Sequence, residues 1–333
     1  MNAVGNALSL ARIYGAYVRR REKCSYLPIF IGVETSGLCN LRCVMCPHGL
    51  EETRQRRGLM NFQTYCRVID EARGFVQDAD LFGGGEPLMH PRIFDMIAYA
   101  RQAGIRTRLH TNATLLTPER GRLLLESGLD YLSFSFDGYT KDRYESIRVG
   151  ADYERSLQNI TDFLGQKQQL GSRRPYTVLQ SIEDTSERLG PDAQAAKDDL
   201  RRRLAGLPLD EFRVIPLHNY GGKVPGSRGQ EGRYSPCTFP YYAIYVLWDG
   251  TIVPCCVDWW GELGLGNICN TSLVDAWGSD GMRNLRRLLG TRRYKEVPLC
   301  SACDRLWRTR RLGIPQRSTQ VVRQFIIQHV LGY

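Results

Sequence analysis

The sequence has no apolar run approaching the roughly eighteen residues that a helix needs to cross a bilayer. It also has no continuous apolar core near its N-terminus, because residues 1–17 include Arg12 and run into the basic group 19–21. We therefore expect no cleavable signal peptide. A disulfide framework, which belongs to small secreted chains, then does not suit the eleven cysteines. These absences predict a cytoplasmic protein whose thiols stay reduced and available to a metal.

The sequence also lacks a concentrated basic patch. Its net charge of +10 comes from short arginine-rich groups at positions 19–21, 54–57, 201–203, 292–293 and 308–311. Nucleic-acid-binding domains instead interleave basic residues with stacking aromatics in one place. We therefore expect no nucleic-acid partner and assign the arginines to solvated faces, with an anionic partner as the alternative.

Two terminal segments, residues 7–20 and 319–331, have the apolar spacing of amphipathic helices. We expect both to pack against the body of the protein. Contact with a membrane surface is the less favoured alternative for them.

The cysteines are clustered, and the first cluster is Cys39, Cys43 and Cys46, spaced four and then three residues apart. Three thiolates with this spacing can bind three corners of a cubane iron-sulfur cluster. Because a 4Fe-4S cluster normally takes four cysteines, one iron would stay open to a ligand that is not protein. A zinc site is the alternative, although such sites usually use paired CxxC or Cys/His units.

Strand and helix patterns alternate from residue 29 to about residue 221, which predicts parallel βα units. The expected strands lie near residues 30–34, 79–82, 105–110, 131–136, 176–182 and 212–216. The expected helices begin near Asn61, Pro91, Thr117, Asp152 and Asp192, and Asn61, Thr117 and Asp192 can cap a first turn. Six strands are too few to close an eight-stranded barrel. The sequence thus predicts an α/β fold.

The cysteine loop, placed after an apolar strand, resembles the signature loop of the radical S-adenosylmethionine (SAM) enzymes. The resemblance implies a partial (β/α)6 TIM-like barrel with its site at the C-terminal ends of the strands. It implies that SAM chelates the open iron of a 4Fe-4S cluster and is cleaved reductively to a 5′-deoxyadenosyl radical. An electron donor of the flavodoxin or ferredoxin type is implied as a partner.

A glycine-rich motif, residues 83–87, directly follows the second predicted strand. It resembles the GGE motif of this family, in which Gly84 and Gly85 would allow close approach of the backbone. Glu86 would then accept a hydrogen bond from the amino group of SAM. A simple turn is the alternative for any glycine run.

Polar residues also follow the third and fourth strands. The resemblance implies that Asn112 contacts SAM, that Ser135 and Asp137 bind the ribose hydroxyls, and that Arg148 pairs with the SAM carboxylate. The alternatives are turn chemistry at the strand ends and, for Arg148, an ordinary surface arginine.

A second cysteine group surrounds a predicted hairpin, residues 242–248 and 251–254, turned by Asp249-Gly250 and followed by a helix from Ser272 to Leu289. The segment resembles the SPASM domain or its shorter twitch form. It departs from the full seven-cysteine form, which carries two auxiliary clusters, because only Cys269 lies between Cys256 and Cys300 and no cysteine follows Cys303. We therefore expect one auxiliary 4Fe-4S cluster, two clusters in all. The implied ligands are Cys237, Cys255, Cys300 and Cys303, with Cys256 as the alternate. A zinc knuckle is the competing interpretation.

These patterns divide the chain into four expected parts. They are an N-terminal arm or helix at 1–28, the partial barrel at 29–225, a small cysteine-rich α+β domain at 226–312, and a C-terminal helix at 313–333.

A single auxiliary cluster most resembles the arrangement of 2-deoxy-scyllo-inosamine dehydrogenase, so we expect a small-molecule substrate, a carbohydrate or aminocyclitol alcohol that is oxidised to a ketone. The auxiliary cluster would accept the electron. His218 and Tyr220, after the last strand, are the candidate substrate contacts, and strand capping is their alternative.

Three other functions stay open. A sugar epimerase would use a cysteine hydrogen donor, for which Cys256 and Cys269 are the candidates. A peptide-modifying enzyme would often carry a leader-binding domain, and we expect the 28 residues before Ile29 to be too few for one. A cluster-bearing scaffold that never cleaves SAM is the non-enzymatic possibility.

Overall fold

The computed structural model describes residues 3–49, 57–183, 190–224, 233–307, 310–311 and 314–315. The predicted C-terminal helix at 313–333 and the predicted domain boundary at 225/226 fall outside these residues, apart from 314–315. No helix of the described part is long and apolar enough to cross a bilayer.

One sheet of eight strands organises the molecule, in the order β6-β5-β4-β3-β2-β1-β7-β8. The first six are β1 (Phe30–Val33), β2 (Asp78–Asp80), β3 (Arg106–Thr111), β4 (Tyr131–Ser135), β5 (Tyr176–Glu183) and β6 (Glu211–Pro216). All six run parallel, as the sequence predicts. The sheet curves without closing, so the partial barrel is confirmed.

The sheet continues beyond β1 into the cysteine-rich segment. β7 (Ala243–Val246) pairs in parallel with β1, and β8 (Ile252–Val253) returns antiparallel to β7. Gly250 has a φ of 86° in the turn between them, which only glycine adopts freely. The predicted hairpin is therefore present, but it extends the barrel sheet. A separate pair, β9 (Arg310–Arg311) and β10 (Ile314–Pro315), lies at the end of the described chain.

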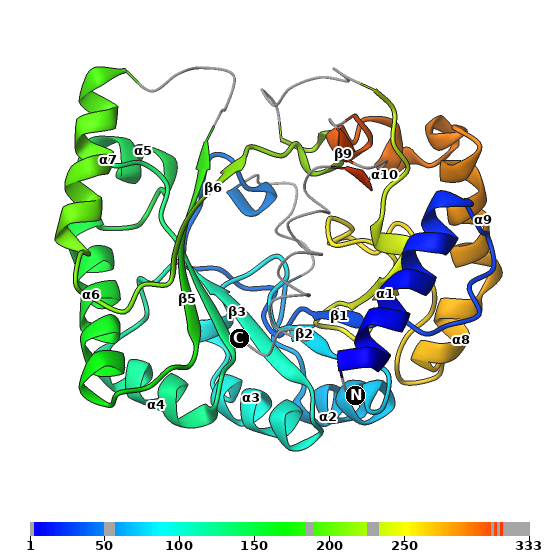
Figure 1. Cartoon of the computed structure of the whole chain (residues 1–333), viewed down its shortest axis with the longest axis horizontal. Coiled ribbons are helices and arrows are strands. Elements are labelled where there is room, and N and C mark those ends of the chain that lie inside the picture. The colour runs from blue at the N-terminus through cyan, green and yellow to red at the C-terminus, as the bar shows by residue number, and fades with distance from the viewer. Residues whose placement is uncertain are drawn as a thin grey trace.

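Helices cover the outer face of the sheet and follow the strands in sequence (Figure 1). They are α2 (Phe62–Ala72), α3 (Ile93–Gln102), α4 (Pro118–Ser127), α5 (Lys141–Ile147), α6 (Tyr153–Gln169) and α7 (Pro191–Arg203). Asn61, Thr117 and Asp152 accept hydrogen bonds from first-turn amides. Asp192 does not, because α7 begins one residue earlier at Pro191 and has Gly190 at its N-cap. That predicted cap is wrong.

The cysteine-rich segment carries α8 (Leu273–Gly278), α9 (Asp280–Gly290) and α10 (Pro298–Ser301). The single helix predicted from Ser272 to Leu289 is in fact two, because the Ser279 hydroxyl caps a new first turn at the Met282 amide. The N-terminal helix α1 (Ala3–Val18) packs on this segment (Figure 1), where Tyr17 contacts Tyr241 and hydrogen-bonds to Ser235. The expectation that the N-terminal helix packs on the body of the protein is confirmed.

Side-chain alternation along the strands separates the core from the cavity. Leu109 on β3 and Leu132 on β4 point outward into the hydrophobic core beneath the helices. Their neighbours on the other face, such as His110, line a cavity inside the curve of the sheet. Polar residues therefore reach the interior of the barrel from strands of the sheet.

Candidate active site

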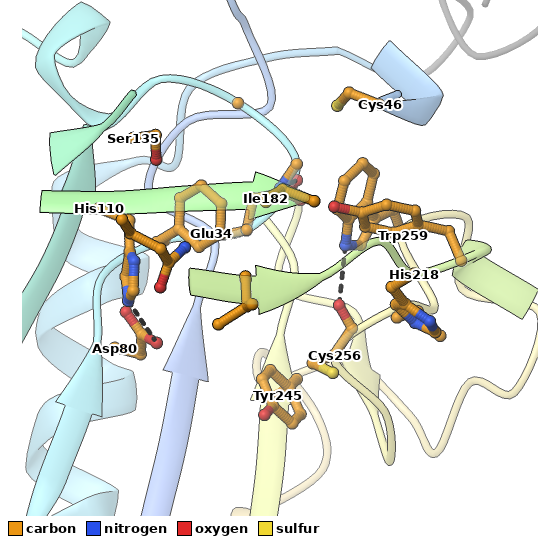
Figure 2. Close-up of a pocket in the computed structure, with 18 of the residues that line it drawn as sticks. Glu34, Cys46, Asp80, His110, Ser135, Ile182, His218, Tyr245, Cys256 and Trp259 are labelled. Atoms are coloured by element: carbon orange, nitrogen blue, oxygen red, sulfur yellow. Dashed lines mark hydrogen bonds and ion pairs between the residues drawn. The ribbon is translucent and has the colours of Figure 1, made fainter. Parts of the chain in front are cut away.

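A cavity of about 430 Å³ lies at the C-terminal ends of the parallel strands. Its size is typical of a pocket for a small ligand. Cys46 and Cys256 lie on one side of the view in Figure 2, and Asp80 of β2 and His110 of β3 lie on the other. Glu34, directly after β1, also lines the cavity. Both cysteine groups of the sequence therefore meet at one cavity.

The first cysteine loop is held by backbone and side-chain contacts from two segments, residues 147–149 and Asn112. The Arg42 amide donates to the Val149 carbonyl at 2.9 Å, and the Val44 amide donates to the Ile147 carbonyl at 3.0 Å. Asn40, inside the loop, accepts from the Asn112 side-chain amide at 3.0 Å. The loop therefore has a fixed shape although it forms no regular element.

The thiols of this loop suit a metal. Cys39, Cys43 and Cys46 all line the cavity, and each lies close enough to another to influence its ionisation. Burial raises the pKa of Cys39 to about 11 and that of Cys46 to about 12. Without a cation these thiols would stay protonated, and a bound metal would replace the protons. The donor set fits three corners of an iron-sulfur cluster.

The glycine-rich loop after β2 contacts the cysteine loop closely. A Cβ on Gly85 would lie 2.3 Å from the carbonyl oxygens of Leu38 and Ser36, so no other residue fits without a backbone shift. The Gly84 amide donates to Glu34 Oε1 at 2.9 Å, and the Glu86 amide donates to the Leu38 carbonyl at 2.8 Å. Glycine is required at position 85 for packing as well as for any ligand.

Glu86 lies deep in the cavity wall and is only 3% exposed. Its Oε1 accepts from the Leu88 amide at 3.1 Å and the Thr111 hydroxyl at 2.8 Å, and its Oε2 accepts from the Asn112 amide at 2.8 Å. A carboxylate oxygen accepts about two hydrogen bonds, so Oε2 retains a position for a cationic ligand group. Burial raises the pKa of Glu86, which those donors oppose.

The other predicted SAM contacts divide into two groups. Asn112, Ser135 and Arg148 line the cavity with Gly84, Gly85 and Glu86. Asp137 is fully buried, bonded to the Arg148 guanidinium and the Ile182 amide, and is outside the set of described residues that line the cavity. Arg148 Nε has no hydrogen-bond partner in the described part of the chain. Arg148 thus keeps a donor for an anionic group, whereas the position of Asp137 suits an anchor for Arg148.

The second cysteine group gathers four thiols from separate segments. Burial raises the pKa of Cys300, with further contributions from Cys237 and Cys303, and the pKa of Cys255 is raised first by its hydrogen bond to Cys256 and by burial, then by Cys237 and Cys300. Burial raises the pKa of Cys303 to about 12. Four mutually close thiols suit a second iron-sulfur cluster that is fully ligated by protein. Cys255 and Cys256 both line the cavity and share a side-chain hydrogen bond, and Cys256 also influences Asp80 and Tyr245.

A charged cluster on β2 and β3, which the sequence analysis did not select, faces the same cavity. Asp80 Oδ2 lies 3.7 Å from His110 Nε2 (Figure 2), and Arg108 lies beside both. Burial raises the pKa of Asp80 to about 7 and lowers that of His110 to about 3. The alternation in Asp78-Ala79-Asp80 was the available signal, because an acid at the carboxyl end of a barrel strand faces the site.

An aromatic wall closes the cavity on the side of the cysteine-rich segment. The Trp259 indole donates to the Cys256 carbonyl at 2.8 Å (Figure 2) and its ring lies 5.2 Å from that of Tyr220. Tyr220 and His218, the predicted substrate contacts, both line the cavity. Cys269 is exposed and belongs to the surface, so of the two predicted hydrogen donors Cys256 alone faces the cavity.

Comparisons with known proteins agree with this geometry. A family model described as the radical SAM superfamily matches residues 33–166, and one described as an iron-sulfur cluster-binding domain, SPASM, matches residues 237–304.

Two curated relatives differ in how much they share. The AdoMet-dependent heme synthase of Methanosarcina barkeri is 34% identical over 134 residues, which is 40% of this chain and 38% of that protein. The tungsten-containing aldehyde ferredoxin oxidoreductase cofactor-modifying protein of Pyrococcus furiosus is 26% identical over 323 residues, 83% of this chain and 88% of that one. The chain thus spans well under half of the heme synthase and most of the second relative.

Solved structures share the fold at low identity. BtrN in complex with AdoMet and 2-DOIA has a TM-score of 0.58 and 19% identity, covering 84% of this chain and 93% of that one. SuiB of Streptococcus suis bound to precursor peptide SuiA has a TM-score of 0.63 and 17% identity, covering 90% of this chain and 74% of that one.

Proposed function

We propose, from the premise that this chain carries a radical SAM domain followed by an iron-sulfur cluster-binding SPASM domain, that it oxidises an alcohol of a carbohydrate or aminocyclitol to a ketone. One observation carries the proposal: the three-cysteine loop, Cys237 and Cys255 of the four-thiol group, and a titratable carboxyl all border one small cavity. The shared fold with BtrN, solved with 2-DOIA, supports this choice of reaction.

When bound, SAM with its 4Fe-4S cluster supplies a hydrogen-abstracting 5′-deoxyadenosyl radical, and the auxiliary 4Fe-4S cluster supplies an electron acceptor. Cys39, Cys43 and Cys46 would hold the first cluster, and Cys237, Cys255, Cys300 and Cys303 the second. Glu86 would accept from the SAM ammonium, and Arg148 would donate to its carboxylate.

Asp80 would accept the proton of the substrate hydroxyl. After one hydrogen atom leaves the alcohol carbon, formation of the ketone still requires loss of the hydroxyl proton and of one electron. Asp80 faces the cavity, and its pKa, raised by burial to about 7, suits a general base near neutral pH. His110 beside it remains neutral, because burial lowers the pKa of His110 to about 3.

Substitution of Asp80 by asparagine is expected to lower ketone formation by about 10²–10⁴-fold, the usual contribution of a general base. In the unmodified protein, ketone formation should rise as pH increases through about 7, because Asp80 accepts a proton only when ionised. Asp80→Asn should remove this rise. The measurement is the rate of ketone formation between pH 5.5 and 8.5.

Glu34 provides the matched control, because burial raises its pKa to about 7 as well. Its carboxylate accepts from the Gly84 and Trp248 amides, so its role is to hold loops together. Glu34→Gln should therefore retain the pH dependence of the alcohol oxidation. Loss of the pH dependence in Glu34→Gln but not in Asp80→Asn would contradict the assignment of the base.

The function itself is tested with anaerobically reconstituted protein, dithionite and SAM, offered a panel of aminocyclitols that includes 2-deoxy-scyllo-inosamine, and sugars with free secondary hydroxyls. The expected products are 5′-deoxyadenosine and a ketone in equal amounts. Formation of 5′-deoxyadenosine with no ketone from any member would argue against the proposal.

Epimerisation is the second candidate, because Cys256 lies in the cavity wall as a hydrogen donor would. Reactions in deuterated water separate the two. Deuterium fixed at one carbon of a product that is neither oxidised nor reduced supports the epimerase and excludes the dehydrogenase.

A further inference from the structure

Arg305 lies between the cavity and the four-thiol group. It follows Cys303 by two residues, in a short 3-10 turn at Asp304–Leu306, and it is partly buried. The Arg305 backbone amide donates to the Cys303 thiol, and its side chain lines the cavity. Its guanidinium carbon lies 5.0 Å from the centre of the Phe239 ring. The cation is therefore held beside the thiols that would ligate the auxiliary cluster.

A chain of polar contacts fixes this guanidinium. Arg305 Nε donates to His218 Nε2 at 3.0 Å, so Nε2 is the acceptor and the imidazole proton is on Nδ1. His218 Nδ1 then donates to the Asp304 carboxylate. Asn219 closes the arrangement, since its amide donates to Asp304 Oδ2 at 3.2 Å and its side chain accepts from the Asp304 amide at 3.2 Å. These hydrogen bonds hold the loop after β6 against the segment that carries Cys300 and Cys303.

One cationic side chain and two carboxylates lie near the four thiols. Arg305 is the cation, and Asp304 and Asp258 are the nearby carboxylates, of which Asp258 is bonded to the Glu262 and Leu263 amides at 2.8 Å. An arginine side chain keeps its proton in proteins, so the guanidinium of Arg305 carries its positive charge beside these thiols.

We infer that Arg305 is a positioning residue that raises the reduction potential of the auxiliary cluster, so that the cluster can accept an electron from the substrate side of the cavity. The inference rests on the proposed function for its purpose. Its physical basis is separate: a fixed positive charge in a region of low dielectric stabilises the state of the cluster that carries the additional electron. His218 acts through Arg305, because it holds the guanidinium against the thiols.

The test uses full-length protein in which Cys39, Cys43 and Cys46 are all replaced by alanine, so that only the auxiliary cluster remains. Its midpoint potential is measured by a redox titration followed by EPR and visible absorption. Arg305→Gln should lower the potential, Arg305→Lys should retain most of the original value, and Asp304→Asn should raise it. Arg287→Gln, which removes a partly exposed arginine of α9, should leave it unchanged because solvent screens that charge.

Opposite shifts from Arg305→Gln and Asp304→Asn, with iron and sulfide content unchanged, are a result that a purely structural role would not give. Equal potentials in all variants, or shifts of the same sign, would overturn the inference. If Arg305→Gln fails to retain the cluster, Arg305→Lys and Asp304→Asn still decide the question. Absence of alcohol oxidation would refute the proposed function alone, since the order of the potentials does not depend on the substrate.

Discussion

Replacement of Cys43 by alanine is expected to abolish formation of 5′-deoxyadenosine, a fall on the order of a thousandfold or more. Cys43 is the central thiol of the loop between Cys39 and Cys46, and the loop offers no fourth cysteine to replace it. Loss of one ligand of three should prevent the first cluster from assembling. The measurements are chromatographic detection of 5′-deoxyadenosine after reduction with dithionite, and iron content per chain, which should fall by roughly half.

Cys66 supplies the matched control. It lies on α2, outside the residues that line the cavity in the described structure. Cys66→Ala should retain both iron content and SAM cleavage. If Cys43→Ala still formed the nucleoside, or if Cys66→Ala lost iron, the assignment of the first cluster to residues 39–46 would be wrong.

The largest expected effect on stability comes from Arg286 on α9. This side chain is 1% exposed, packs 4.3 Å from the Trp277 ring, and donates to the carbonyls of Pro240, Glu22 and Trp277. Arg286→Met keeps the aliphatic stem but leaves these carbonyls without their donor. Since a buried unsatisfied polar group costs about 1–3 kcal/mol, we expect a loss of about 3 kcal/mol in the free energy of unfolding, measured by urea denaturation of the cluster-loaded protein.

Arg287, the next residue of α9, provides a control for the substitution of Arg286. Arg287 is partly exposed on the same helix, and its guanidinium donates to the Asn284 side chain at 2.6 Å. Arg287→Met should change the free energy of unfolding by no more than about 0.5 kcal/mol. Equal effects from the two substitutions would show that the buried donors of Arg286 contribute little.

The sequence predicted those parts of the site whose residues lie close together in the chain. Cys39, Cys43 and Cys46 share a loop, and Gly84, Gly85 and Glu86 share a turn directly after a strand. Such motifs are visible because local chemistry and local spacing coincide. The parallel strands could also be predicted, because each βα unit in the sequence shows an apolar run followed by a helix with one polar face.

The rest of the site depends on residues that only the fold brings together. Asp80 reaches the cavity through the register of β2, and Trp259 reaches it from a loop after β8. The guanidinium of Arg305 is held by a hydrogen bond to His218, which lies 87 positions earlier in the chain. Nothing in the local sequence distinguishes that arginine from those on the surface. The split between α8 and α9 was missed although Gly278 and Ser279 signal it, since glycine weakens a helix and serine favours an N-cap.

The pairing of β1 with both β2 and β7 has a practical consequence for anyone who prepares fragments of this chain. A fragment that stops before β7 would leave the amide and carbonyl groups along one side of β1 open to water. It would also uncover Gly32, over which the Tyr245 ring normally lies. A bare strand edge of this kind readily recruits strands from other molecules, so the N-terminal portion expressed by itself should precipitate or form mixed oligomers.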